Sequence, residues 1–113
     1  MTVAELQERL SLTALSLPDG ERTVDGAYMG DLLSWVMGRA GENQAWITIM
    51  TNMNVIAVAS LSDVSCVLLA EDVMPDQAVI DTANARDINL LRSPLSSYDL
   101  AVALSDALRK ASL

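Results

Sequence analysis

Apolar positions along the chain follow two patterns that alternate. Short, nearly continuous apolar runs are typical of strands buried on both faces, and they occupy residues 12–17, 45–50, 64–70 and 88–91. Between these runs, apolar residues recur at spacings of three and four, which predicts helices over residues 1–10, 32–40, 53–61, 75–86 and 96–111. The pattern therefore predicts one helix followed by four strand–helix units.

Two segments are less clearly patterned. Residues 53–61 fit a buried helix or a buried strand equally well, because periodicity does not separate the two at this length. We interpret them as a helix, since residues 45–50 and 64–70 on either side read as strands and parallel strands need a crossover. Residues 22–28 carry neither pattern, and we expect them to be irregular or extended.

Residues at the ends of the predicted helices support their placement. Thr2 and Glu5 have the spacing of a capping box at the start of the first helix. Asp31 is placed to cap the second helix, and Gly41 to end it in a left-handed conformation. Pro75 stands at a first-turn position of the fourth helix, where proline is tolerated. These signals predict helix boundaries close to those given by the apolar spacing.

The element order defines the expected fold class. Strands that alternate with helices of about ten residues predict right-handed parallel crossovers. We therefore expect an α/β fold, a three-layer Rossmann-like sandwich with a mostly parallel sheet of about four to five strands. Its length of 113 residues suits one domain spanning residues 1–113. Within that domain, residues 1–10 are expected to form an N-terminal helix with a mobile end.

Charge and composition exclude several classes of partner. The formal net charge is −8, from 15 acidic and 7 basic residues. Nucleic acid and anionic membranes are therefore not expected as partners, because binding them depends on Lys and Arg; positively charged faces of other proteins remain open. No apolar run is long enough to span a bilayer, and a single cysteine fits a reducing compartment. The expected location is the cytoplasm.

The chain lacks the usual groups of a catalytic site. It contains no histidine to act as a base or metal ligand, and no glycine-rich phosphate-binding motif. Cys66 lies inside an apolar run and is interpreted as a buried hydrophobic residue. Glu71 and Asp72 are the right type for a hard cation or for acid–base work, but a lone acidic pair is more often part of a solvated loop. We expect no enzyme activity, no cofactor and no metal site.

The best candidate for a ligand site lies at the carboxyl ends of the predicted strands, where parallel α/β sheets bind their ligands. Arg92, followed by hydroxyls and the start of the last helix, is suited to hold a phosphate or a carboxylate. The simpler interpretation is that Ser96 caps the last helix in a second capping box with Asp99, which does not exclude a ligand role. Asn52 or Asn54 is likewise placed to cap the helix at 53–61. The candidate ligand-binding residues are Thr51, Asn52, Asn54, Glu71, Asp72, Arg92, Ser93, Ser96 and Ser97.

Two aromatic residues near the second helix suggest an interface. Trp35 lies off the main apolar stripe of that helix, and Tyr28 precedes it. Exposed aromatic residues beside apolar ones mark protein interfaces more often than ligand pockets. We therefore expect a homodimer that uses the region of Tyr28 and Trp35.

From Tyr28 onward, three segments of the sequence carry a resemblance to a known family. They are YMGDLLSWVM, then AWITIMTNMNVIAVASL, then VSCVLLAEDVMPDQAVIDTANARDINLLRSPLSSYDLAVAL. In these segments the chain resembles the DRTGG domain family in its small, stand-alone version. More distantly, it resembles the N-terminal domain of HPr kinase/phosphorylase, which has a similar order of proline, helix, strand, LLRS and helix.

The resemblance implies a Rossmann-like regulatory domain without activity of its own, with the lone versions linked to redox or hydrogenase systems. The chain departs from the family at two places. Where fused members tend to carry Asp-Arg and Thr-Gly-Gly, residues 51–54 read TNMN and residues 70–72 read AED. The loss of the arginine and the glycines removes a cation and a close backbone approach that an anionic ligand would use.

Two functions follow from these observations. The first is a non-catalytic regulatory or adaptor module that acts through contacts with another protein. The alternative is a small-molecule sensor that binds a nucleotide or another anionic ligand at the carboxyl ends of the strands.

Overall fold

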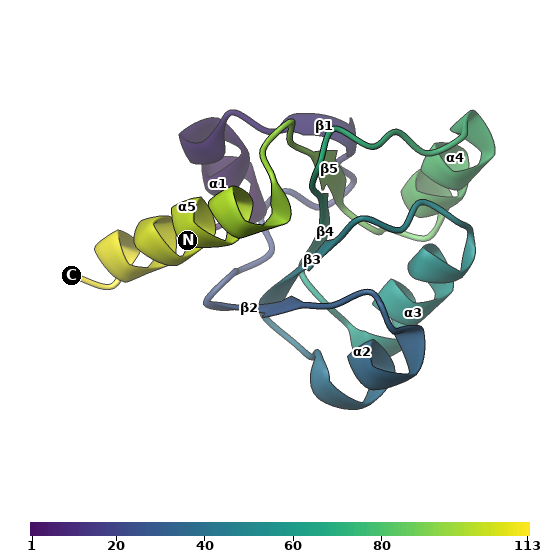
Figure 1. Cartoon of the computed structure of the whole chain (residues 1–113), viewed down its shortest axis with the longest axis horizontal. Coiled ribbons are helices and arrows are strands. Elements are labelled where there is room, and N and C mark those ends of the chain that lie inside the picture. Colours follow the sequence, from purple (N-terminus) through teal and green to yellow (C-terminus); the bar gives the residue numbers. More distant parts are fainter.

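The computed structural model describes the whole chain, residues 1–113, as an α/β fold with five helices and five strands (Figure 1). The elements in chain order are α1 (Val3–Leu10), β1 (Thr13–Ser16), β2 (Gly26–Met29), α2 (Leu33–Arg39), β3 (Gln44–Thr48), α3 (Asn54–Ser62), β4 (Cys66–Leu69), α4 (Gln77–Ala85), β5 (Leu90–Arg92) and α5 (Ser97–Ala111). The predicted fold class is confirmed, and so is the helix expected over residues 53–61. None of the helices combines the length and the apolar character needed to cross a bilayer.

The five strands form one sheet in the order β1-β5-β4-β3-β2. Strands β2 to β5 are parallel to their neighbours, and β1 is added antiparallel to β5 at one edge. Helices α2, α3 and α4 cover one face of the sheet, while α1 and α5 cover the other (Figure 1). The layers are therefore helix, sheet and helix, as the alternation of strands and helices predicts.

Two apolar cores lie on opposite faces of the sheet, because successive strand residues point to opposite sides. Trp46, Val67 and Leu69 pack under α2, α3 and α4. Ile47 and Leu68 pack under α1 and α5. Strands covered on both faces need apolar residues at consecutive positions, which explains the continuous runs in the sequence.

Three local predictions need correction, and one segment is more regular than expected. Residues 22–28 are expected from the sequence to be irregular or extended, and Gly26–Met29, which overlaps their end, forms the edge strand β2. Asp31 does not cap α2, since the N-cap position is Leu32 and no side chain caps that end. Gly41 is not left-handed; Asn43, with φ 65°, is the residue with positive φ in this loop. Pro75 precedes the N-cap of α4 rather than lying in its first turn.

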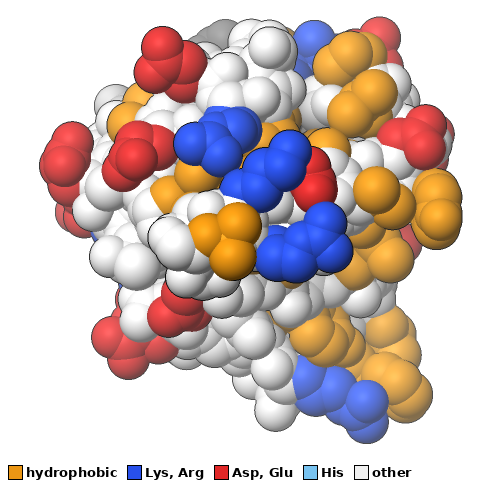
Figure 2. Space-filling model, turned by 90° about the vertical axis from the view of Figure 1, so that its left-hand side faces the viewer, with side chains coloured by type: hydrophobic (Ala, Val, Ile, Leu, Met, Phe, Trp, Pro, Cys, Tyr) orange, Lys and Arg blue, Asp and Glu red, His pale blue; other side chains and the backbone are white.

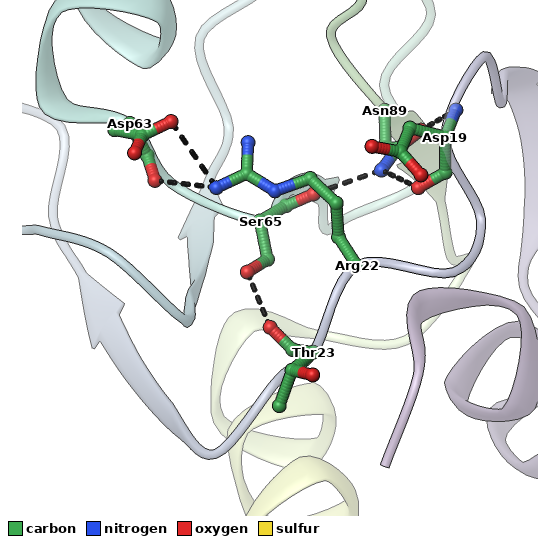
Figure 3. A network of polar contacts seen from close by, with 6 residues as sticks. All are labelled: Asp19, Arg22, Thr23, Asp63, Ser65 and Asn89. Atoms are coloured by element: carbon green, nitrogen blue, oxygen red, sulfur yellow. Dashed lines mark hydrogen bonds and ion pairs between the residues drawn. The ribbon is translucent and has the colours of Figure 1, made fainter.

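The connection from β1 to β2, residues 17–25, crosses the amino edge of the sheet from one side to the other, and a polar network holds it there (Figure 3). The buried Asn89 amide accepts a hydrogen bond from the Asp19 backbone N–H (3.0 Å) and donates to the carbonyls of Asp19 (2.7 Å) and Ser65 (2.9 Å). The Ser65 hydroxyl donates to the Thr23 carbonyl at 2.5 Å. The start of both β4 and β5 is thereby bound to this connection.

An ion pair adds a further attachment to the same edge (Figure 3). The Arg22 guanidinium donates to the backbone carbonyl of Asp63 at 3.0 Å and to its carboxylate at 3.1 Å. Thr2 also forms an antiparallel bridge with Thr23, so the first residues of the chain contact the connection. The β1–β2 connection and the first residues of the chain therefore cover the amino edge of the sheet. The loops at the carboxyl edge remain accessible.

Candidate functional site: the carboxyl edge of the sheet

The loops that follow the four parallel strands lie together at one edge of the sheet, on the side that faces the viewer in Figure 1. They comprise residues 30–32, 49–53, 70–76 and 93–96. The ligand-binding residues predicted from the sequence lie in these loops or at the adjoining helix starts and strand ends. Between β4 and β5 the following helices diverge, because α4 covers one face and α5 the other. Such a divergence is where ligands usually bind in open α/β sheets.

At this divergence the start of α5 is already occupied by a carboxylate of the chain itself. Glu71 Oε2 accepts a hydrogen bond from the Ser97 backbone N–H at 2.7 Å. The Glu71 backbone N–H donates to the Leu95 carbonyl, also at 2.7 Å. Glu71 and Asp72 both have left-handed backbones, with φ of 63° and 59°, which is uncommon for residues other than glycine. The loop after β4 therefore places an anionic group where an external anion would bind.

The Arg92 guanidinium holds the same loop. It donates to the carbonyl of Asp72 at 2.7 Å and to its carboxylate at 2.8 Å, and its Nε donates to the Val73 carbonyl at 3.0 Å. Three of its contacts are thus made within the chain. An external phosphate would have to compete with Asp72 for this cation.

The two serines of the candidate site also have local partners. Ser93 is buried, and its Oγ accepts a hydrogen bond from the Leu95 backbone N–H at 3.1 Å. Ser96 Oγ accepts from the Asp99 backbone N–H at 3.1 Å, which confirms Ser96 as the cap of α5. The Asp99 carboxylate does not bond back to Ser96, so the predicted second capping box is only half formed. The Ser96 hydroxyl stabilises the start of α5, and the Ser93 hydroxyl stabilises the loop that precedes it.

The residues after β3 lie across a hollow from the start of α4. Met53 occupies the N-cap position of α3 and no side chain caps it, so the cap expected at Asn52 or Asn54 is wrong. Asn52 Oδ1 instead accepts a hydrogen bond from the Asn54 backbone N–H at 3.0 Å, in the turn that leads into the helix. The hollow has a volume of about 420 Å³ and is lined by Thr51, Asn52, Met53, Met74, Asp76, Ala78 and Val79. Apolar and polar residues both line it, and its one charged group is the Asp76 carboxylate.

The carboxyl edge also carries most of the large apolar side chains that the molecule exposes. We call this the carboxyl-edge surface, and it consists of Met29, Leu32, Ile49, Met53, Met74, Leu95 and Tyr98. Every loop that follows a parallel strand contributes at least one of them. This side of the molecule forms the right-hand side of Figure 2, where hydrophobic side chains gather in a band from top to bottom. The sequence analysis missed this surface.

The two predicted interface aromatics differ in exposure. Trp35, on α2, is 53% exposed, and the Arg39 guanidinium lies 3.9 Å from the centre of its ring. Tyr28 is half-buried and packs against the core under α2. Of the predicted pair, Trp35 is the one that a partner can contact.

Groups that could support chemistry are tied up or buried. Glu71 and Asp72 direct their carboxylates to different partners, and no three Cys, Asp or Glu side chains gather in a geometry suited to a metal ion. Cys66 is fully buried, as predicted, and burial raises the pKa of its thiol to about 12. The thiolate needed for nucleophilic attack is therefore strongly disfavoured.

Fold and site together describe a small Rossmann-like α/β domain whose carboxyl edge is apolar and whose charged groups there are largely paired within the chain. No protein-family model and no curated protein matches the sequence. Among solved structures, the chain is similar to the CBS and DRTGG domains of the regulatory region of Clostridium perfringens pyrophosphatase, which was crystallised with its activator diadenosine tetraphosphate. The TM-score is 0.71 at 14% sequence identity, over 90% of this chain and 45% of that one. The chain thus spans less than half of that structure, and at this identity the likeness concerns the fold.

Proposed function

We propose that this protein is a non-catalytic regulatory or adaptor module that binds another protein through the carboxyl-edge surface. The observation that carries the proposal is the concentration of exposed apolar side chains in the loops after the parallel strands. Exposed apolar side chains gathered on one side of a domain are typical of interaction sites. Met29, Met53 and Met74 contribute flexible side chains that adapt to a partner's shape.

The polar groups at the same edge support binding of a protein rather than of a small anion. A pocket for a small molecule usually offers a few free polar groups that converge on the ligand. Here Arg92, Ser93 and Ser96 have partners within the chain. Apolar side chains remain as the main contacts that the edge offers to another molecule.

The partner can be sought by capture from cells with matched variants. Met53→Ser removes an apolar side chain from the carboxyl-edge surface, and Leu61→Ser removes one on α3 that is 75% exposed but lies outside it. We expect the wild type and Leu61→Ser to retain the same protein and Met53→Ser to lose it. Elution of the wild type alone, or equal capture by Met53→Ser, would contradict the proposal.

Membership of the DRTGG family is part of the proposal. It is supported by the sequence resemblance from Tyr28 onward and by the fold shared with a regulatory region that contains CBS and DRTGG domains. The link to redox or hydrogenase systems depends on the resemblance alone.

Self-association through α2 is a second contact we propose. Trp35 and Met37 are both exposed on this helix, and Trp35 carries the Arg39 guanidinium on its ring. Light scattering at micromolar concentration should give the mass of two chains, and Trp35→Ser should return the mass of one. A single-chain mass for the wild type would refute the homodimer.

The alternative function is a sensor that binds a nucleotide or another anionic small molecule. It is favoured by the nucleotide activator bound to the similar pyrophosphatase region. Arg92 is the cation such a ligand would use after displacing Asp72. A ligand present at 100 times its dissociation constant raises the unfolding free energy by about 2.7 kcal/mol. Thermal shifts with AMP, ATP and diadenosine tetraphosphate test this. If none of the three raises the midpoint of thermal unfolding of the wild type, the protein does not bind these nucleotides. If a shift persists in Arg92→Ala, Arg92 is not the cation that binds the ligand.

A further inference from the structure

The carboxyl edge is strongly acidic as well as apolar. Exposed carboxylates stand in every loop or helix start of this edge except that of α3, and Arg92 is the one cation there. The acidic residues are Asp31, Glu71, Asp72, Asp76 and Asp99. Five acidic groups and one basic group give a local charge of −4, half of the −8 carried by the whole chain.

Two of these carboxylates have no partner. The side chains of Asp76 and Asp99 form neither a hydrogen bond nor an ion pair within the chain, although Asp76 occupies the N-cap position of α4. Asp76 lies at the hollow of about 420 Å³ between α3 and α4, with Met53 and Met74 in its lining. Two methionines next to a free carboxylate suit a long side chain that is apolar along its stem and cationic at its end.

We infer that the partner presents a segment of apolar side chains flanked by Lys or Arg, with one of these cations entering the hollow beside Asp76. This inference rests on the proposed function and names the chemistry of the partner. Methylene groups of the entering side chain would contact Met53 and Met74, and its charged end would pair with Asp76. The segment's apolar residues would cover the rest of the carboxyl-edge surface.

Charge complementarity decides between this partner and others. A second copy would bring the same acidic groups to the carboxyl edge, and like charges across an interface oppose association. A basic segment is attracted over a distance by the net negative field, which raises its association rate in a salt-dependent way. Binding at this edge should therefore weaken as salt is added.

Three synthetic peptides with a fluorescent label test the inference by anisotropy. One is helical with Leu on one face and Lys on the other, the second has Glu in place of Lys, and the third has Ser in place of Leu. We expect the Leu/Lys peptide to bind most tightly. Asp76→Asn should weaken it by about two- to fivefold at low salt, the range for an exposed ion pair. Glu42→Gln removes one negative charge at the opposite edge and should change its affinity little.

Two results would overturn the inference. One is a Leu/Lys peptide that binds no more tightly than the Leu/Glu peptide, and the other is an equal loss in Glu42→Gln and Asp76→Asn. Met53→Ser distinguishes failure of the basic-partner inference from failure of the proposed function. If the Leu/Glu peptide binds and Met53→Ser weakens its binding, the carboxyl edge is an apolar docking surface and only the inference of a basic partner is wrong. If no peptide responds to Met53→Ser, the docking surface is wrong as well.

Discussion

Replacement of Asn89 by alanine tests how firmly the β1–β2 connection is held. Asn89 is 1% exposed and lies directly before β5. Its amide accepts one hydrogen bond and donates two, to groups of Asp19 and Ser65 that belong to two other parts of the chain. Alanine would remove all three bonds without supplying a polar group in their place.

The cost can be worked from these contacts. A hydrogen bond contributes about 1 kcal/mol net to stability, and a buried partner left without one adds to the loss. Three bonds give a loss of about 3 kcal/mol in the free energy of unfolding, out of a total of about 5–15 kcal/mol for a typical domain. The midpoint of thermal unfolding should fall by about 10 °C or more.

Urea denaturation followed by circular dichroism measures the effect. Asn84→Ala is the control, because Asn84 is an exposed asparagine on α4, and its change should stay within about 0.5 kcal/mol. If Asn89→Ala loses no more stability than Asn84→Ala, the network does not hold the amino edge in the way its geometry indicates.

Three further outcomes are expected. Cys66, whose thiol pKa is raised to about 12 by burial, should resist a thiol reagent at pH 8 in the native protein and react once urea unfolds it; rapid native labelling would show that β4 opens. Hydrogen bonds from the Thr2 backbone and then its hydroxyl lower the pKa of Glu5 below 4.5, so its stabilising contribution is present above that pH and lost as the pH falls through the lowered pKa. Glu5→Gln should therefore be less stable than the wild type at pH 7 and approach it in acid, and a gap that is constant with pH would contradict this. Arg92→Met should lose about 2 kcal/mol of stability, since its charged hydrogen bonds to the loop at Asp72 vanish while its apolar stem is kept; an unchanged urea midpoint would show that the pair is not formed in solution.

The strands buried on both faces could be predicted from the sequence, whereas the edge strand β2 could not. Strands β3 and β4 are covered by helices on both sides, so their apolar runs are unmistakable. Strand β2 has one neighbour, and its burial alternates between half-buried Gly26 and Tyr28 and exposed Ala27 and Met29, which leaves little pattern. The prediction of a left-handed Gly41 failed for a different reason. The Gln44 side chain accepts a hydrogen bond from the Gly41 backbone N–H at 2.9 Å, and residue propensities do not predict such a contact.

The apolar periodicity of the sequence predicted where the candidate site lies, but it did not predict which of its charged groups are paired. Parallel strands bring their carboxyl ends to one edge, so the predicted loops do meet. Glu71 contacts Ser97 and Asp72 contacts Arg92 across 26 and 20 residues of sequence, and no local pattern reveals such pairs. The apolar surface did leave a signal in the sequence, since Met74 and Leu95 are large apolar residues between predicted elements.

The separation of β1 from β2 has a consequence for how the chain acquires its structure. These strands follow one another in sequence, yet they stand at opposite margins of the sheet, and β1 pairs only with β5. Strand β1 therefore cannot pair until the chain has been synthesised as far as β5. Contacts between such distant positions slow folding, and a chain truncated before β5 would leave β1 without a strand to pair with.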